Sequence, residues 1–301
     1  MTVPGSAFVS ALLAITAGGM SACSSPPVKS ATSVEDSVRR LAPVPACLTV
    51  LSSSSRPSGA TTSLRAEYWQ IVFPRFDPRT RSLPDDALAC TGRPILSDAA
   101  FEGAKLQPGL DDARITLGGG ADGIRAVWLR SHDAPDAASA GAVALVRVQG
   151  DAAYVIGVGA YRGRSATRLS IERLGNELLL LAFDNGCPGS PAIDPCSATE
   201  TIYFVRQGRL VVATQLQLER VDFAVGSEPA ATGRIRYHLT ASPSFVGDAL
   251  DVVEHVSVQD AGGREIRWAE VERRFLVVGD ALEAVDAPLW SRVFRSTTAK
   301  R

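Results

Sequence analysis

Histidine, serine and cysteine side chains act as acid–base catalysts, nucleophiles and metal ligands, and the chain has three histidines. None of them forms a metal-ligand pair with another histidine or with a cysteine nearby in the sequence. His238 in RIRYHLT and His255 in VVEHVSV lie in alternating segments typical of strands. The nucleophile pattern Gly-x-Ser-x-Gly is absent from the sequence. The sequence therefore predicts no catalytic residue, although a triad of residues distant in the sequence stays open.

Two segments carry side chains that could bind a metal ion. The His132-Asp133 dipeptide resembles that of metal phosphohydrolases, but those enzymes need further ligands on helices, and the surrounding RSHDAPDAAS is typical of a surface loop. The segment DNGCPGSPAIDPC contains Asp184, Asn185 and Asp194, whose oxygen atoms are ligands of the kind that Ca²⁺ takes. Its Pro, Gly and Cys residues are equally typical of a strand connection closed by a disulfide. We predict no metal and no cofactor, with a calcium loop as the alternative.

A glycine-rich stretch, GVGAYRG at 157–163, has some features of a dinucleotide-binding unit. It follows an apolar segment, and the next apolar segment, ELLLLAF, ends on Asp184. The intervening TRLSIERL at 167–174 alternates in polarity, however, and the Gly-Asn pair at 175–176 is typical of a hairpin turn. A strand in that position provides no helix N-terminus for phosphate groups. The pattern thus favours a hairpin over a nucleotide site.

The N-terminal residues indicate export. Residues 7–17 (AFVSALLAITA) are apolar, uncharged and shorter than the roughly 20 residues of a bilayer-spanning helix, which is typical of a signal-peptide core. The sequence MSAC at 20–23 resembles the lipobox of bacterial lipoproteins, in which an aliphatic and two small residues precede an acylated cysteine. The resemblance implies cleavage after residues 1–22, acylation of Cys23 and a membrane anchor. An ordinary secretory signal that leaves Cys23 as a free thiol is the alternative.

The residues after Cys23 fit a tether. The stretch SSPPVKSATS is polar and contains proline, so residues 23–45 cannot bury enough apolar surface to fold alone, although a short helix is expected at 33–41. The residue directly after the cysteine is Ser24 and not an aspartate. By resemblance to enterobacterial lipoproteins, this implies sorting to the outer membrane. The predicted partner of this end of the chain is therefore a membrane.

Four further cysteines, Cys47, Cys90, Cys187 and Cys196, form an even set in an exported chain, which predicts two disulfides. Proximity in the sequence favours Cys47 with Cys90 and Cys187 with Cys196. In the loop-entropy model these closures contribute roughly 4 and roughly 3 kcal/mol. A zinc site is the alternative, but the chain has no Cys-x-x-Cys pair.

Composition and length bound the rest of the chain. Lys and Arg number 31 against 32 Asp and Glu, and the formal net charge of -1 excludes the dense positive field of a nucleic-acid binder. About 280 residues remain after cleavage, enough for one large β domain, which we expect at 46–294 with a tail at 295–301. Residues 46–117 carry more proline and loop, and could be a subdomain.

Alternation of apolar and polar residues dominates from Ala46 onward. The runs are separated by turn signals, which predicts a mainly β fold, an antiparallel meander that forms a sandwich or barrel. A propeller is the alternative. The expected strands are 65–73, 124–129, 142–148, 153–159, 167–174, 177–183, 201–205, 210–218, 234–240, 250–258 and 265–278.

Helix signals are scarce. Pro84 to Ala89 (PDDALA) has proline at the first helical position and acids in the first turn, and Leu96 to Lys105 could add one or two turns. The four tryptophans lie in or beside apolar stretches, so core packing is expected for each of them, with a role in lining a ligand site as the alternative; they are Trp69, Trp128, Trp268 and Trp290.

Taken together, these features predict a lipid-anchored cell-envelope protein with an extracytoplasmic domain. It would act as a non-catalytic binding or structural module, with an envelope protein or glycan as its partner. The alternative is a carrier that holds a hydrophobic ligand in a half-open barrel, and an envelope hydrolase is the third candidate. An open apolar barrel interior would favour the carrier, whereas a filled core with an exposed apolar patch would favour the binding module.

Overall fold

Strands make up most of the computed structural model, which describes residues 45–51, 65–96, 98–119, 123–187, 195–225 and 234–298. The mainly β prediction is confirmed, with 61% of the described residues in strands and 7% in helices. The predicted signal peptide, Cys23, the tether as far as residue 44, its short helix and Asp194 lie outside the described residues.

Ten of the predicted strands are present, most of them longer than the alternation indicated. Four short strands that the sequence did not predict complete the sheet: β1 (Cys47–Val50), β2 (Lys105–Leu106), β3 (Ile115–Gly118) and β14 (Ala281–Ala284). The predicted ones are β4 (Ile124–Asp133), β5 (Ser139–Gln149), β6 (Ala152–Gly163), β7 (Arg168–Leu174), β8 (Glu177–Asn185), β9 (Cys196–Arg206), β10 (Arg209–Val225), β11 (Arg234–Val246), β12 (Ala249–Gln259) and β13 (Glu265–Val278).

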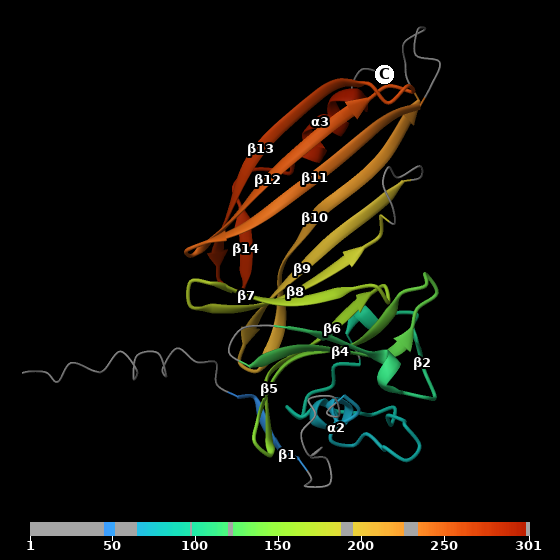
Figure 1. Cartoon of the computed structure of the whole chain (residues 1–301), viewed down its shortest axis with the longest axis vertical. Coiled ribbons are helices and arrows are strands. Elements are labelled where there is room, and N and C mark those ends of the chain that lie inside the picture. The colour runs from blue at the N-terminus through green and yellow to red at the C-terminus, as the bar shows by residue number, and fades with distance from the viewer. Residues whose placement is uncertain are drawn as a thin grey trace, which may run out of the picture. The chain divides into compact units, whose positions relative to one another are not determined.

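The strands follow two antiparallel meanders within one 14-stranded sheet that is not closed (Figure 1). The first runs through β4, β5 and β6, with β1 paired to β6 and with β2 and β3 paired to β4. The second runs from β7 to β14, each strand paired to the next. A single parallel pairing, Arg209 with Val158, joins β10 to β6. Because this contact is parallel, the sheet is mixed.

The two meanders pack face to face. Trp128 and Leu145 of the first meander share a buried cluster with Leu180 and Tyr203 of the second. The opposite face of the second meander carries its own cluster, in which Phe204 of β9 meets strands β12 to β14. The second meander therefore curls, so that its two ends enclose apolar side chains as in a sandwich.

One prediction was wrong at the first helix. Residues 65–73 were expected as a strand, but α2 (Tyr68–Val72) occupies this segment. Its buried side chains, Tyr68, Trp69, Ile71 and Val72, recur with the spacing of a helical face and cover the outer face of β4, β5 and β6. A short apolar run does not distinguish a buried helix from a strand, which explains the error.

The helices predicted on the sequence signals also differ. PDDALA forms only a turn, in which the Ala87 N–H donates to the Pro84 carbonyl at 3.0 Å, because so short a segment does not repay helix nucleation. Within 96–105 a single 3₁₀ turn forms at Ala99–Phe101, capped by the Asp98 carboxylate. The longest helix among the described residues, α3 (Leu289–Thr298), was not predicted and crosses residue 294, the expected end of the domain.

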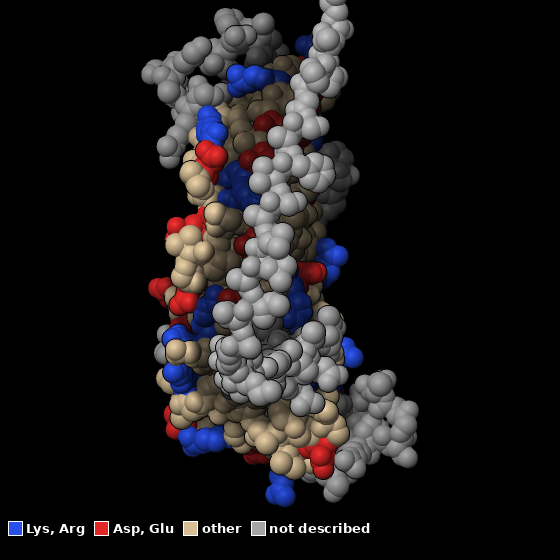
Figure 2. Space-filling model, turned by 90° about the vertical axis from the view of Figure 1, so that its left-hand side faces the viewer, with Lys and Arg blue, Asp and Glu red and all other residues tan. Residues whose placement is uncertain are grey.

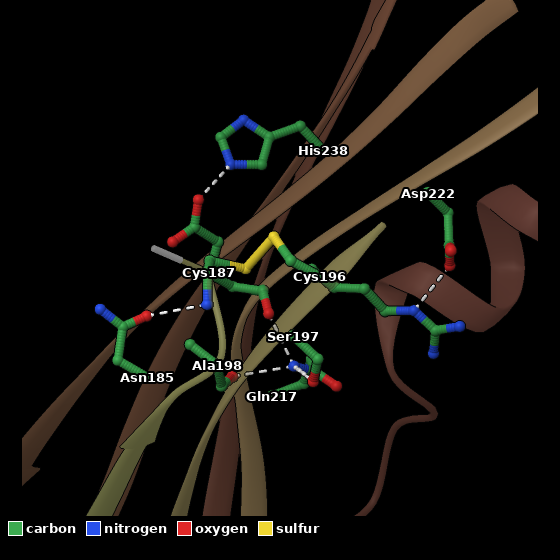
Figure 3. The surroundings of a disulfide bond; sticks show 10 residues. Asn185, Cys187, Cys196, Ser197, Ala198, Gln217, Asp222 and His238 are labelled. Atoms are coloured by element: carbon green, nitrogen blue, oxygen red, sulfur yellow. Dashed lines mark hydrogen bonds and ion pairs between the residues drawn. A yellow bond between two sulfur atoms is a disulfide. The ribbon is translucent and has the colours of Figure 1, made fainter. Parts of the chain in front are cut away.

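Both disulfides pair as predicted. Cys47 bonds Cys90, which ties β1 to the segment after α2, and Cys187 bonds Cys196 across the connection between β8 and β9 (Figure 3). Each bridge fastens an irregular segment to a strand. The first bridge closes the loop-rich region onto the sheet.

Candidate binding pocket beneath the C-terminal helix

A pocket of about 320 Å³ lies between α3 and the enclosed face of β10 to β13. This volume falls in the lower part of the range of small-molecule sites, roughly 300 to 1,000 Å³. Figure 1 shows α3 beside the strands of this end of the second meander. The lining residues are Thr214, Gln215, Leu216, Gln217, Arg220, Leu239, Val252, Glu254, Arg273, Phe275, Pro288, Trp290 and Ser291.

Strand alternation determines which side chains reach the pocket. Val252 and Glu254 lie two positions apart on β12, and Arg273 and Phe275 do so on β13, so each pair shares a face. Pairing between β10 and β9 shifts register between Gln217 and Glu219. Such bulges bend a strand and increase its twist, and this one lies beside the pocket.

A buried ion pair forms one wall. Arg273 Nη1 donates to Glu254 Oε1 at 2.5 Å, and the two side chains are 10% and 7% exposed. Glu254 Oε2 accepts the Leu289 N–H of α3 at 2.6 Å, and Arg273 Nε donates to the Asp286 carbonyl at 3.0 Å. A carboxylate at a helix N-terminus satisfies an N–H that has no partner within the helix. The pair therefore holds α3 over the pocket.

Arg220 of β10 forms a second polar contact with the helix. Its guanidinium carbon lies 4.9 Å from the centre of the Trp290 ring, and Nε donates to Asp222 Oδ2 at 2.8 Å. Figure 3 shows Asp222 beside α3. Among the described residues, none accepts a hydrogen bond from the two terminal nitrogens of Arg220. Those donors are available to a ligand.

His132 and Asp133 lie at the end of β4. The prediction of a loop was wrong for these two residues, because the loop begins only after Asp133. His132 Nδ1 lies 2.8 Å from the Oγ of the buried Ser131, and burial lowers the pKa of His132. Asp133 instead accepts two hydrogen bonds from Arg114, at 2.8 and 3.1 Å, which lower its pKa. The serine is thus inaccessible, and the carboxylate is committed to an arginine.

The other two histidines lie in strands, as predicted. His238 Nε2 is 3.1 Å from Glu219 Oε1, and His255 Nδ1 is 3.6 Å from Glu270 Oε2. Within the described residues, no histidine is hydrogen bonded to both a hydroxyl and a carboxylate. In this part of the chain, the contacts of the histidines therefore assemble no serine–histidine–acid triad.

Two of the three proposed calcium ligands, Asp184 and Asn185, make other contacts. Asp184 Oδ2 lies 3.3 Å from Arg164 Nη1, and Asn185 Oδ1 accepts the Cys187 N–H at 3.0 Å (Figure 3). In the part of the chain that the structure describes, no three His, Cys, Asp or Glu residues are placed to hold a metal ion.

The glycine-rich stretch is part of β6, and the strand predicted after it is confirmed as β7, in a hairpin with β8. A Cβ atom at Gly159 would lie 2.7 Å from the Leu210 carbonyl oxygen. Glycine is required there because β10 approaches the backbone of β6 so closely, which gives this residue a packing role.

The tryptophans divide between the interior and the surface. Trp69 and Trp128 are buried, as predicted. Trp290 lines the pocket. The prediction for Trp268 was wrong, because its side chain is 61% exposed on the outer face of β13, where its ring stacks on His255.

The face seen in Figure 2 carries interspersed acidic and basic side chains.

A buried carboxylate lies outside the pocket. Glu200 of β9 is 8% exposed, and its Oε2 has no hydrogen-bond partner. Burial, and to a smaller extent the charge of Glu172, raises its pKa to about 6. The side chain pairs across the ladder with Leu216, a lining residue.

Sequence reasoning missed the three charged lining residues, Arg220, Glu254 and Arg273. For Glu254, the sequence does contain a signal. Glu254 alternates with Val252 and Val256, which are both buried, and a charge at such a position indicates a buried partner. The partner itself, on another strand, could not be identified without the strand register.

No family model, curated protein or solved structure matches this chain. Among the described residues, neither α-helix is long and apolar enough to cross a membrane. The geometry of the pocket is therefore the basis for assigning a function.

Proposed function

We propose that this protein is a non-catalytic binding module of the bacterial cell envelope and that the pocket beneath α3 is its ligand site. The observation that carries the proposal is a pocket of small-molecule size, about 320 Å³, held open between a sheet and a helix by the Glu254–Arg273 pair. Apolar side chains form most of one wall, and polar groups lie at fixed positions, an arrangement typical of ligand sites.

The filled interior supports a binding module over a carrier of long hydrophobic ligands. Buried side chains such as Leu181, Phe204 and Leu250 occupy the space inside the curl of the second meander. A carrier would need that space to be open. The pocket accommodates only a small ligand, so a larger envelope protein or glycan would have to bind elsewhere on the surface.

The envelope location rests on the sequence. MSAC at 20–23 resembles a lipobox, and the two disulfides fit an oxidising compartment outside the cytoplasm. Acylation of Cys23 would anchor the domain to the outer membrane. In a diderm bacterium, we expect radiolabelled palmitate to label the wild type and not Cys23→Ala. Absence of label in both proteins would contradict the lipid anchor, but it would not bear on the proposal that the pocket binds a ligand.

Two adjacent valines provide a matched test of the pocket. Val252 lines it and is 1% exposed, whereas Val253 points to the outer face and is 39% exposed. N-phenyl-1-naphthylamine, an uncharged apolar probe, should bind to the wild type with enhanced fluorescence. Val252→Phe should weaken binding at least about tenfold, and Val253→Phe should leave it unchanged.

The folding of each variant is checked by thermal unfolding. If Val252→Phe lowers the melting temperature, Ser291→Phe is used in place of Val252→Phe, because Ser291 lines the pocket from α3. Equal binding by the filled and unfilled proteins, or no binding of the probe to the wild type, would contradict the pocket as a ligand site.

A further inference from the structure

We infer that the pocket selects a small amphipathic anion, with an apolar body against the strands and a carboxylate or similar group at Arg220. This inference rests on the proposed function, because it assigns the chemistry of the same site. It follows from three features: the terminal donors of Arg220, the carboxylate of Glu254 that is already paired with Arg273, and the apolar wall opposite them.

Arg220 provides the donors. A guanidinium carries five N–H groups, and Asp222 takes the one on Nε. The contact with the Trp290 ring and the hydrogen bond to Asp222 restrict the guanidinium, whose terminal nitrogens form a planar fork. Such a fork matches the two oxygens of a carboxylate.

Glu254 is already paired with a cation. One of its oxygens accepts from Arg273, and the other accepts from the Leu289 N–H. Among the described residues that line the pocket, Glu254 is the single acidic one, and it faces two arginines. An ammonium ligand would meet a carboxylate that is already paired, and the Arg220 guanidinium would repel it.

The apolar body of the ligand has a defined surface. Leu216, Leu239, Val252 and Phe275 come from four adjacent strands and face α3. Phe275 lies beneath the Arg273 guanidinium, whose carbon is 4.8 Å from the ring centre. A short alkyl or aryl group could lie on these side chains while its charged end reaches Arg220.

The test compares three ligands that share one alkyl chain: octanoate, 1-octanol and octylamine. Each is titrated into the protein at low ionic strength with bound N-phenyl-1-naphthylamine, and displacement is measured. Octanoate should displace the probe at about tenfold lower concentration than 1-octanol, because a hydrogen bond to a charged group is stronger than one to a neutral group. Octylamine should be no better than 1-octanol.

Variants locate the effect. Arg220→Gln should abolish the advantage of octanoate and leave 1-octanol unchanged, and Arg220→Lys, which keeps the charge but lacks the fork, should retain part of it. Arg274→Gln removes the same charge from the outer face, where Arg274 pairs with Asp251, and should have no effect. Probe binding by each variant shows that its pocket is intact.

The outcomes separate the two proposals. If 1-octanol competes as well as octanoate, or if Arg220→Gln keeps the preference, the anion inference is overturned while the pocket stands. If the probe does not bind, or if Val252→Phe does not weaken its binding, the ligand site is overturned and the inference with it.

Discussion

The two helices α2 and α3 each cover one face of the sheet, but they are held there in different ways. Four of the five residues of α2 are buried among apolar side chains of β4 to β6, and the Cys47–Cys90 disulfide closes the region. Beneath α3 the buried cluster of Leu239, Val256 and Leu289 is small, and partly buried side chains such as Trp290 and Val293 pack against it. A carboxylate and two guanidinium groups add polar contacts to this helix.

The difference shows how one architecture provides both a scaffold and a site. Close packing leaves no volume for a ligand, and the α2 end is packed in this way. Fixed polar contacts hold a helix at a distance from a sheet without filling the space between them. The α3 end therefore has room for a ligand, and its stability depends on a few polar groups.

The largest expected effect comes from the ion pair. Glu254→Ala leaves Arg273 buried without its partner and Leu289 N–H without an acceptor, so the free energy of unfolding should fall by about 3–5 kcal/mol. Urea denaturation measures this loss, and limited proteolysis should cut before α3. Glu272→Ala, on the exposed face of β13, should change stability by less than about 0.5 kcal/mol. Equal losses would show that the pair does not hold α3.

The disulfides should differ by the length of the loops they close. Replacing Cys47 and Cys90 together by serine should cost about 4 kcal/mol, and replacing Cys187 and Cys196 together about 3 kcal/mol, because the sequence separations are 43 and 9 residues. Thermal and urea unfolding of both double variants would measure the difference. A larger cost for the shorter loop would contradict the entropic explanation.

A smaller effect depends on pH. The pKa of Glu200 is raised to about 6 in the folded protein from 4.5, so its ionisation opposes folding. Its protonated form is favoured in the folded state, so the contribution of Glu200 to stability is largest below about pH 4.5 and falls as the pH rises through about 6. The loss at pH 8 is on the order of 2 kcal/mol.

Glu200→Gln should remove this dependence and stabilise the protein at pH 8. Chemical unfolding of both proteins at pH 4.5 and pH 8 provides the comparison. Identical pH profiles for wild type and variant would indicate that Glu200 titrates normally.

The sequence predicted the strands well because polarity alternates along most of β4 to β13. It also predicted both disulfides, because short separations left one favoured pairing. It failed at α2, where a run of apolar residues is compatible with two structures. The helix α3 was missed because LWSRVFRS carries only four large apolar residues, and its stability comes from tertiary contacts.

The pocket could not be predicted because its walls come from segments distant in the sequence. Glu254 and Arg273 become neighbours only through the pairing of β12 with β13, and Leu289 meets them only after α3 folds back. The sequence around each of these residues contains no motif that marks it as part of a site. The constellation is a property of the register and of the curl of the sheet.

The four tryptophans provide the most direct test of the ligand site, since each reports on a different region. Trp69 lies at the α2 end, Trp128 between the meanders, Trp268 on the outer face and Trp290 in the pocket. Indole N–H signals in ¹⁵N-labelled protein, assigned by Trp→Phe variants, are followed during titration with octanoate. The signal of Trp290 should shift while the other three stay in place. A shift confined to Trp268 or Trp69, or no shift at saturating ligand, would contradict a site beneath α3.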